Sequence, residues 1–110
     1  EFYTQYLKNI EGVVIPSIKE DRTHVFQTFA ISVDHRDQVL EEMKSRGIGV
    51  LIHYPIPVHL QEAYADTGYK QGDFPITKKA SKEALSLPMN SFLTNDQIDY
   101  VTSKIKEKIS

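Results

Sequence analysis

Residues 24–52 read HVFQTFAISVDHRDQVLEEMKSRGIGVLI and contain three consecutive structural patterns. The segment 24–33 is rich in β-branched and aromatic residues, which predicts a strand with one strongly buried face. That face would carry Val25, Phe29, Ile31 and Val33, with only Gln27 interrupting it. A second short run, Ile48 to Ile52, is apolar on both faces and predicts an internal strand.

A helix is predicted between these two strands. Asp34 suits the N-cap, and Asp37 suits the positive end of the helix dipole in the first turn. Arg46 and Gly47 form a typical exit, with a cation in the last turn followed by a glycine that tolerates positive φ. The apolar stripe consists of Val39, Leu40 and Met43. A strand, a helix and a further strand in this order predict a crossover unit.

The segment before this unit also has regular patterns. Apolar residues at helical spacing predict a helix over residues 2–10, which Gly12 would end. Residues 13–16 read VVIP and predict a short extended piece that stops at the proline. Residues 17–22 are polar and predict a loop.

The C-terminal part continues the alternation of helix and strand. Pro75 can occupy the first turn of a helix to about Ala84, with Ile76, Ala80, Ala84 and Leu85 facing inward, and residues 84–88 predict an extended piece. Thr94 and Gln97 have the spacing of a capping box. The helix that follows carries its inner stripe on Ile98, Val101, Ile105 and Ile109.

These patterns predict one small two-layer α+β domain over residues 1–110, in which a short sheet, mixed or antiparallel, packs against helices. The length of 110 residues suits a single domain. Residues 53–72 look irregular, with one helical turn at 60–65. An irregular segment of this length is more often functional or covered by a partner than idle.

Composition excludes several classes of function. The formal net charge of −2 gives no electrostatic footprint for nucleic acid, and no apolar run is long enough to span a membrane. The chain has no cysteine, which fits a reducing compartment, and we expect a cytoplasmic protein. Its first residues lack both an initiator methionine and a signal pattern, as though cut from a longer protein.

Catalytic and metal-binding patterns are also missing. His53 and His59, with His24 or His35, match no recurrent ligand spacing, so no metal site is expected. There is no nucleophile elbow, no glycine-rich phosphate loop and no obvious pair of carboxylates for acid–base work. We therefore expect no catalytic residue within this chain.

Residues 53–59 read HYPIPVH and are the remaining candidate. Pro55 and Pro57 bias the residues before them toward extended backbone, so the side chains of His53 and Tyr54 sit on a stiff segment. Such a pair suits contact with a polar, planar or phosphorylated ligand. The alternative reading of the same residues is a rigid loop in which the tyrosine packs on the core and the histidine caps a backbone carbonyl.

Three strings in this order resemble the C-terminal domain of the DegT/DnrJ/EryC1/StrS sugar aminotransferases. They are RGIGVLIHYPIPVHLQEAY at 46–64, GDFP at 72–75 and LSLPMNSFLTNDQIDYV at 85–101. The resemblance implies a pyridoxal-phosphate enzyme with the fold type I architecture of aspartate aminotransferase. Such enzymes transfer an amino group, usually from glutamate, to a keto group on a nucleotide-linked sugar.

In this family a large domain precedes the small one and carries the Schiff-base lysine. The resemblance therefore implies that residues 1–110 are the small C-terminal domain and residues 1–11 the end of an interdomain helix. Lys70, Lys78 and Lys79 do not match the family's catalytic lysine. The catalytic large domain is absent, so we expect the chain alone to bind no pyridoxal phosphate and to be inactive.

By the same resemblance, His53, Tyr54, His59 and Gln61 are expected to contact the nucleotide-sugar substrate, without moving protons themselves. The expected partners are the chain's own large domain and a second subunit of a homodimer. The sequence departs from the family pattern at Val50–Leu51 and at Lys78, so the resemblance does not imply which sugar is bound. A regulatory binding module of the same fold, a dehydratase relative and a domain with unrelated ligand chemistry remain alternatives.

Overall fold

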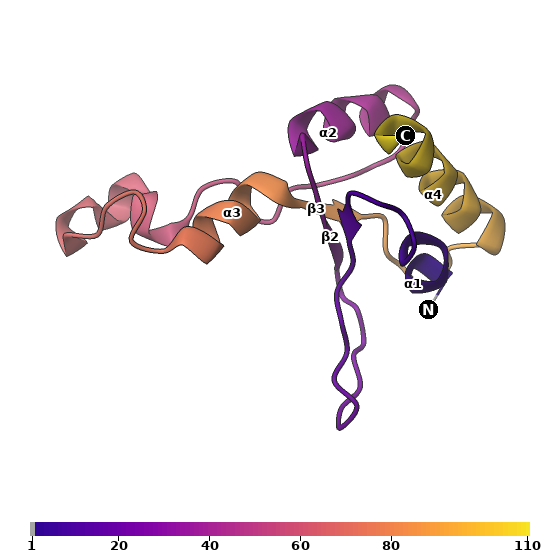
Figure 1. Ribbon diagram of the computed structural model, residues 1–110, viewed down its shortest axis with the longest axis horizontal. Helices are drawn as coiled ribbons and strands as arrows, with labels where there is room; N and C mark the ends of the chain where they lie inside the picture. The colour runs from indigo at the N-terminus through magenta and orange to yellow at the C-terminus, as the bar shows by residue number, and fades with distance from the viewer. Residues whose placement is uncertain (1) are drawn as a thin grey trace.

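The computed structural model describes residues 2–110 and contains four α-helices, two 3-10 helices and three strands within that range (Figure 1). In chain order these are α1 (Phe2–Leu7), β1 (Val13–Val14), β2 (Phe29–Val33), α2 (Arg36–Ser45), η1 (Val58–Leu60), η2 (Glu62–Thr67), α3 (Pro75–Glu83), β3 (Ala84–Leu87) and α4 (Asn95–Ile109). The predicted α+β class is confirmed.

The sheet has the order β1-β2-β3, and both pairings are antiparallel. Beyond β3, Leu51 forms an isolated antiparallel bridge with Ser86. The predicted crossover is confirmed only in its path: Leu51 runs parallel to β2 on the other side of β3, and α2 lies between them in the chain, but Leu51 forms an isolated bridge and no second strand. Of the two sheet types expected, the described residues form only antiparallel pairs.

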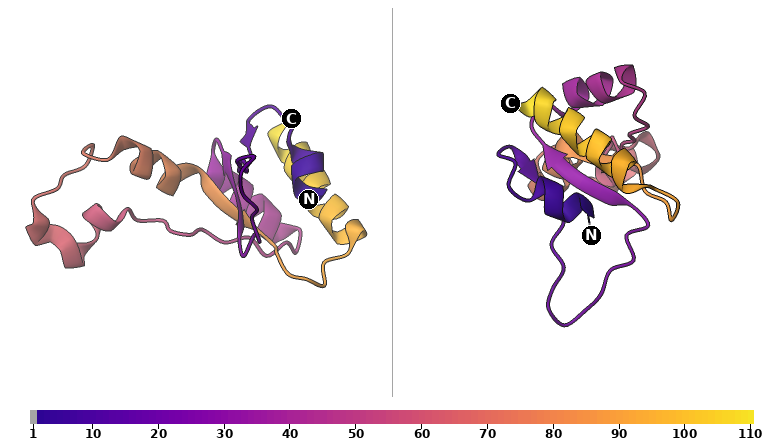
Figure 2. Two further views of the ribbon diagram at one scale, coloured as in Figure 1. Left: turned by 90° about the horizontal axis from the view of Figure 1, so that it is seen from below. Right: turned by 90° about the vertical axis from the view of Figure 1, so that its right-hand side faces the viewer.

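Helices cover one face of this sheet (Figure 2). Alternate residues of β2 and β3 point into a core shared with α1, α2 and α4, because a strand turns successive side chains to opposite faces. The core consists of Tyr3, Leu7, Phe29, Ile31, Val33, Val39, Met43, Ile48, Val50, Leu85, Leu87, Ile98, Val101 and Ile105. The other face carries small side chains, including Ala30, Ser32, Ala84 and Ser86, which the register pairs across β2 and β3.

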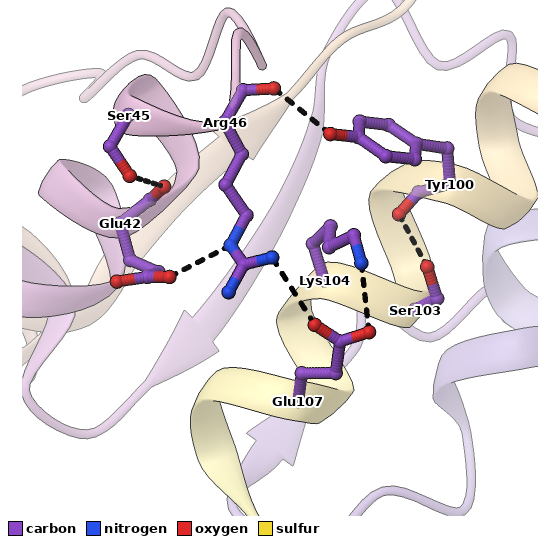
Figure 3. A network of polar contacts seen from close by, with 7 residues as sticks. All are labelled: Glu42, Ser45, Arg46, Tyr100, Ser103, Lys104 and Glu107. Carbon is purple, nitrogen blue, oxygen red and sulfur yellow. Dashed lines mark hydrogen bonds and ion pairs between the residues drawn. The ribbon is translucent and has the colours of Figure 1, made fainter.

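Helices α2 and α4 are also joined by a polar network at the surface (Figure 3). The Arg46 guanidinium lies 2.8 Å from a carboxylate oxygen of Glu42 and 3.4 Å from one of Glu107. The Tyr100 hydroxyl donates to the Arg46 carbonyl at 3.1 Å. A hydrogen bond from the Lys104 ammonium holds the pKa of the Glu107 carboxyl below its usual range. The network therefore links the C-terminus of α2 to two turns of α4.

Two segments project from this body (Figure 1). One is the loop of residues 15–28, and the other is an arm of residues 53–83 that contains η1, η2 and α3. The radius of gyration is 15.4 Å, against about 13 Å for a compact domain of this length. Within the arm only His59 and Ser81 are buried. The arm therefore has little core of its own.

The first predicted strand is shorter than expected, since β2 begins at Phe29. Val25 was placed on the buried face and is instead 93% exposed. The backbone of Phe26 has φ 48, which breaks the alternation of a strand. The short β1 pairs only with the end of β2, so residues 24–28 have no partner strand among the described residues.

The predicted N-cap at Asp34 is wrong. Helix α2 begins at Arg36, and His35 occupies the cap position in left-handed conformation without a side-chain cap bond. The exit is confirmed, because Gly47 follows the helix with φ 76.

The predicted internal strand 48–52 is wrong as well. Leu51 makes only the edge bridge to Ser86 and is 61% exposed.

The C-terminal predictions are largely confirmed, including Pro75 in the first turn of α3 and the Thr94–Gln97 capping box of α4. The inward face predicted for this segment is wrong for Ile76, which is 84% exposed, and for the exposed Ala80. It is confirmed for Leu85, which is buried in the core, although Leu85 and the half-buried Ala84 belong to β3. Helix α3 lies in the arm, outside the core, and Ile76 and Ala80 line an open groove beside the small-residue face of the sheet. The irregular segment 53–72 holds two 3-10 helices in place of the single predicted turn.

At the N-terminus, α1 ends at Leu7, well before Gly12. Gly12 instead has φ 85 in the turn that leads to β1. Glu1, the first residue of the predicted interdomain helix 1–11, lies outside the described residues. That these residues join two domains stays a prediction.

Candidate functional site

The candidate site is centred on His53, at the free edge of the sheet. Leu51 and Ser86 exchange two backbone hydrogen bonds of 3.1 and 2.8 Å, which fix the path of the chain two residues before His53. The Nδ1 atom of His53 then lies 2.9 Å from the hydroxyl oxygen of Ser86. The edge bridge thus places the imidazole against a residue 33 positions further along the chain.

Ser86 is a rigid anchor for this contact. It lies on β3 between two leucines that point into the core, so its own side chain points to the opposite face of the sheet. Its backbone faces Ala30 on one side and Leu51 on the other. Ser86 is only 6% exposed. A buried hydroxyl costs free energy unless it is hydrogen-bonded, and His53 supplies the partner.

Tyr54 completes an exposed pair with His53. The two rings meet edge to face, with centroids 5.6 Å apart, and a cis peptide bond joins the residues. Tyr54 is 75% exposed. An anchored imidazole beside a free phenol therefore offers hydrogen-bonding groups and a ring face to a ligand that approaches the edge of the sheet.

His59 and Gln61 lie further out, in the arm. The His59 ring is buried and packs edge to face on Phe74 with centroids 4.8 Å apart, and Tyr69 packs on the same phenylalanine at 5.0 Å. His59 Nε2 is buried and has no hydrogen-bond partner among residues 2–110. The ring lines an open hollow of about 370 Å³ in the arm. His59 therefore belongs to the small aromatic cluster that gives the arm its shape.

The Gln61 side-chain amide donates to the Ile56 carbonyl at 3.5 Å, a long and weak contact. Within residues 2–110, no hydrogen bond or ring contact joins His59 or Gln61 to His53 or Tyr54. The four predicted site residues thus form an inner pair at the sheet edge and an outer pair in the arm. Their contact with substrate stays a prediction for all four.

Sequence reasoning did not single out Ser86 or Arg36. Ser86 stands in the string LSLP, where a serine between core leucines indicates a polar contact on the far side of a strand. Arg36 is buried, and its guanidinium donates to the carbonyls of Ser81 at 2.7 Å and Ala84 at 3.1 Å. No local signal reveals a contact between the start of one helix and the end of another.

The residues of this chain do not fit a pyridoxal-phosphate site. A Schiff-base lysine needs a desolvated amine, and no lysine within residues 2–110 is buried. Lys70 and Lys79 are exposed, and Lys78 is only partly covered. The same part of the chain contains no group of three or more His, Asp or Glu side chains placed to hold a metal ion. No helix in it has the length and apolar character needed to cross a membrane.

Comparison with known proteins finds sugar aminotransferases by family model and by sequence. The model of the DegT/DnrJ/EryC1/StrS aminotransferase family matches residues 1–106. A "pleiotropic regulatory protein" of Geobacillus stearothermophilus is 43% identical over 107 residues, which cover 96% of this chain and 29% of the relative. A dTDP-3-amino-3,6-dideoxy-alpha-D-galactopyranose transaminase of Aneurinibacillus thermoaerophilus is 30% identical over 104 residues, or 94% of this chain and 28% of that enzyme.

The fold has equally clear matches among solved structures. The crystal structure of DesV from S. venezuelae, in complex with a ketimine intermediate, superimposes with a TM-score of 0.93 and 30% identity. The match covers 98% of this chain and 29% of DesV. The chain therefore spans less than a third of the length of the proteins it resembles.

Proposed function

The chain belongs to the DegT/DnrJ/EryC1/StrS aminotransferase family, and from that membership we propose that it is the C-terminal small domain of a pyridoxal-phosphate-dependent enzyme. The whole enzyme would transfer an amino group, with glutamate as donor, to a keto group on a nucleotide-linked sugar in the cytoplasm. The cofactor and the lysine that binds it would belong to a preceding large domain. The names of several relatives, which are sugar transaminases, support this assignment.

Within that enzyme, this chain would supply one wall of the nucleotide-sugar site. The observation that carries this assignment is the His53 ring, held by Ser86 at 2.9 Å beside the exposed Tyr54. An anchored ring loses little side-chain entropy when a ligand binds, which favours its use in recognition. His59 and Gln61 on the arm would extend the same wall. The role of these four residues is to bind and orient the substrate.

The surface of the chain supports its docking to other parts of the enzyme. Large apolar side chains are strongly exposed on both projections and on the turn before α4, among them Val25, Ile76 and Phe92. Apolar side chains that form a contiguous exposed surface usually mark a surface that a partner covers. We propose that the large domain and the second subunit of a homodimer cover them.

The test replaces His53 with alanine and Tyr54 with phenylalanine in the full-length protein. Each change removes a hydrogen-bonding group from the proposed wall, so the KM for the nucleotide sugar should rise by roughly tenfold. Tyr54→Phe should leave the melting temperature unchanged, because Tyr54 is exposed. His53→Ala also removes the partner of the buried Ser86 hydroxyl and should cost about 1–3 kcal/mol of stability, so the KM is measured well below its melting temperature.

Two matched controls belong to this test. His35→Asn changes an exposed histidine at the start of α2 to a residue that tolerates its positive φ, and Tyr64→Phe changes a half-exposed tyrosine in the arm. Both controls should keep the KM of the natural protein. If His53→Ala and Tyr54→Phe also leave the kinetic constants unchanged, the site assignment fails.

A regulatory module of the same fold is the second candidate, because the relative at 43% identity bears the name "pleiotropic regulatory protein". The sequence that precedes this chain separates the two. A lysine in the expected motif of the large domain favours the transaminase. A replacement such as histidine favours a sugar dehydratase or a protein without transaminase activity.

A further inference from the structure

We propose that Ser86 is a positioning residue that holds neutral His53 in the tautomer with its proton on Nε2. His53 would then present a hydrogen-bond donor to whatever binds at the sheet edge. The tautomer is a property of this chain alone, whereas the identity of the ligand rests on the proposed function.

The direction of the hydrogen bond follows from counting protons. A serine hydroxyl has one proton to donate, and the only hydrogen bond of the Ser86 side chain among the described residues is the one to His53 Nδ1 at 2.9 Å. If Nδ1 carried the proton and donated, the Ser86 hydroxyl proton would be left without an acceptor at a buried position. Leaving a buried donor unpaired is unfavourable. Ser86 therefore donates and Nδ1 accepts.

The anchor cannot easily move to satisfy the opposite arrangement. The backbone of Ser86 is paired with Leu51 through two hydrogen bonds and faces Ala30 in the register of β2 and β3. The hydroxyl proton itself can rotate about the Cβ–Oγ bond, but among the described residues the Ser86 side chain has no hydrogen-bond partner other than His53 Nδ1. The geometry thus favours one tautomer before any ligand arrives.

The tautomer of His53 limits which groups it can recognise. With Nδ1 occupied, the exposed Nε2–H of His53 can only donate while the ring is neutral. The group it faces must therefore be an acceptor, such as a carbonyl, hydroxyl or phosphate oxygen. An ammonium group, which only donates, does not match it. Nucleotide-linked keto-sugars carry several such oxygens and suit this edge.

Two other histidines of the chain, His24 and His35, serve as references for the tautomer of His53. The backbone amide of Phe26 donates to His24 Nδ1 at 2.8 Å, and a backbone amide cannot reverse its role, so His24 must carry its proton on Nε2 when neutral. His35 is exposed and makes no side-chain cap bond at the start of α2. Its tautomers should therefore follow the preference of a free imidazole.

The experiment is ¹⁵N-edited NMR of the histidine rings in the 110-residue chain, at a pH where the imidazoles are neutral. A ring nitrogen without a proton resonates far downfield of a protonated one, so the spectrum reports the tautomer directly. In the natural sequence, His53 should match His24, with Nδ1 bare and Nε2 protonated. In Ser86→Ala the ratio of the two tautomers of His53 should fall by roughly tenfold toward that of His35.

Ser86→Thr keeps a hydroxyl on the strand and should restore the ratio, which a merely structural change at this position would not do. The His24 signals should stay constant in all variants. A natural chain with the proton on His53 Nδ1, or a ratio that Ser86→Ala does not change, overturns the inference. The first of these outcomes needs no variant to fold.

This result is independent of the proposed function, since no sugar nucleotide is present in the measurement. If His53 has the expected tautomer but His53→Ala leaves the KM of the full-length protein unchanged, the substrate assignment fails and the positioning role of Ser86 stands. If His53 has the opposite tautomer, the positioning role fails whatever the kinetics show.

Discussion

Tyr3 connects the N-terminal helix to the far end of the sheet. Its hydroxyl donates to the Pro88 carbonyl at 2.8 Å, and its ring packs on Phe29 with centroids 5.2 Å apart. Burial disfavours the charged phenolate and raises the pKa of Tyr3 to about 12. The folded chain therefore keeps a phenol proton that the unfolded chain releases near pH 10.

Stability should consequently fall between pH 10 and pH 12. In that window the unfolded state binds fewer protons than the folded state, so the free energy of unfolding decreases as the pH rises. The Tyr3 contribution to this loss is roughly 2–3 kcal/mol. Tyr3→Phe should lower stability at neutral pH by about 1 kcal/mol and weaken the alkaline decline, as measured by urea unfolding at several pH values.

Tyr69→Phe is the matched control for this prediction, because Tyr69 is exposed in the arm. It should leave the alkaline decline as steep as in the natural chain. Equal slopes in Tyr3→Phe and the natural chain would show that the phenol of Tyr3 is not the group responsible.

Among the elements, α2 is joined to the end of α3, where the arm meets the body, through the side chain of Arg36. Arg36 lies in the first turn of α2, yet its buried guanidinium caps carbonyls at the end of α3 and at the start of β3. Cations at the C-terminal end of a helix interact favourably with its dipole. The neighbouring Asp37 accepts from the same side chain at 2.8 Å, which compensates the buried charge.

Arg36→Met should therefore destabilise the chain by about 1–3 kcal/mol, since methionine fills similar space but leaves buried carbonyls without donors. Chemical denaturation would measure the loss, and amide hydrogen exchange should increase at the C-terminal end of α3. Arg22→Met serves as control, because Arg22 forms only an exposed ion pair with Asp21 in the projecting loop. A denaturation midpoint equal to that of the control would contradict the role given to Arg36.

At the scale of the whole molecule, the chain has a small core from which two segments project. The helix-covered face of the sheet is closed, whereas the arm and the loop of residues 15–28 reach outward (Figure 2). Such extended segments hold few buried apolar contacts, and their local stability is correspondingly low. The proposed binding residues His53 and Tyr54 are therefore exposed at the edge of the sheet, away from its helix-covered face.

We expect the 110-residue chain alone neither to retain pyridoxal phosphate nor to transaminate. None of the lysines in residues 2–110 is buried, so none has the environment that activates a Schiff-base amine. The chain would be incubated with the cofactor and passed through gel filtration, and its absorbance near the aldimine band would then be read. A band that persists with the protein would contradict this prediction.

Much of the fold was predictable because its signals are local. Helix α4 has its capping box and its apolar stripe within one continuous segment, and α2 has its exit signal at Gly47. The errors arose where a local pattern had no partner in space. Val25 alternates correctly for a strand, but no neighbouring strand extends far enough to pair with it.

The candidate site likewise contains features that local sequence predicted and contacts that it did not. Composition and proline spacing in HYPIPVH were enough to mark His53 and Tyr54 as an accessible pair on a stiff segment. The contact that orients His53 comes from Ser86, and the one that seats the arm joins Arg36 to Ser81. Periodicity extends over a few residues of one element, whereas these contacts depend on where the sheet and the helices bring distant segments together. The sequence by itself therefore identified the chemical groups of the candidate site, whereas only tertiary packing determined how they are oriented.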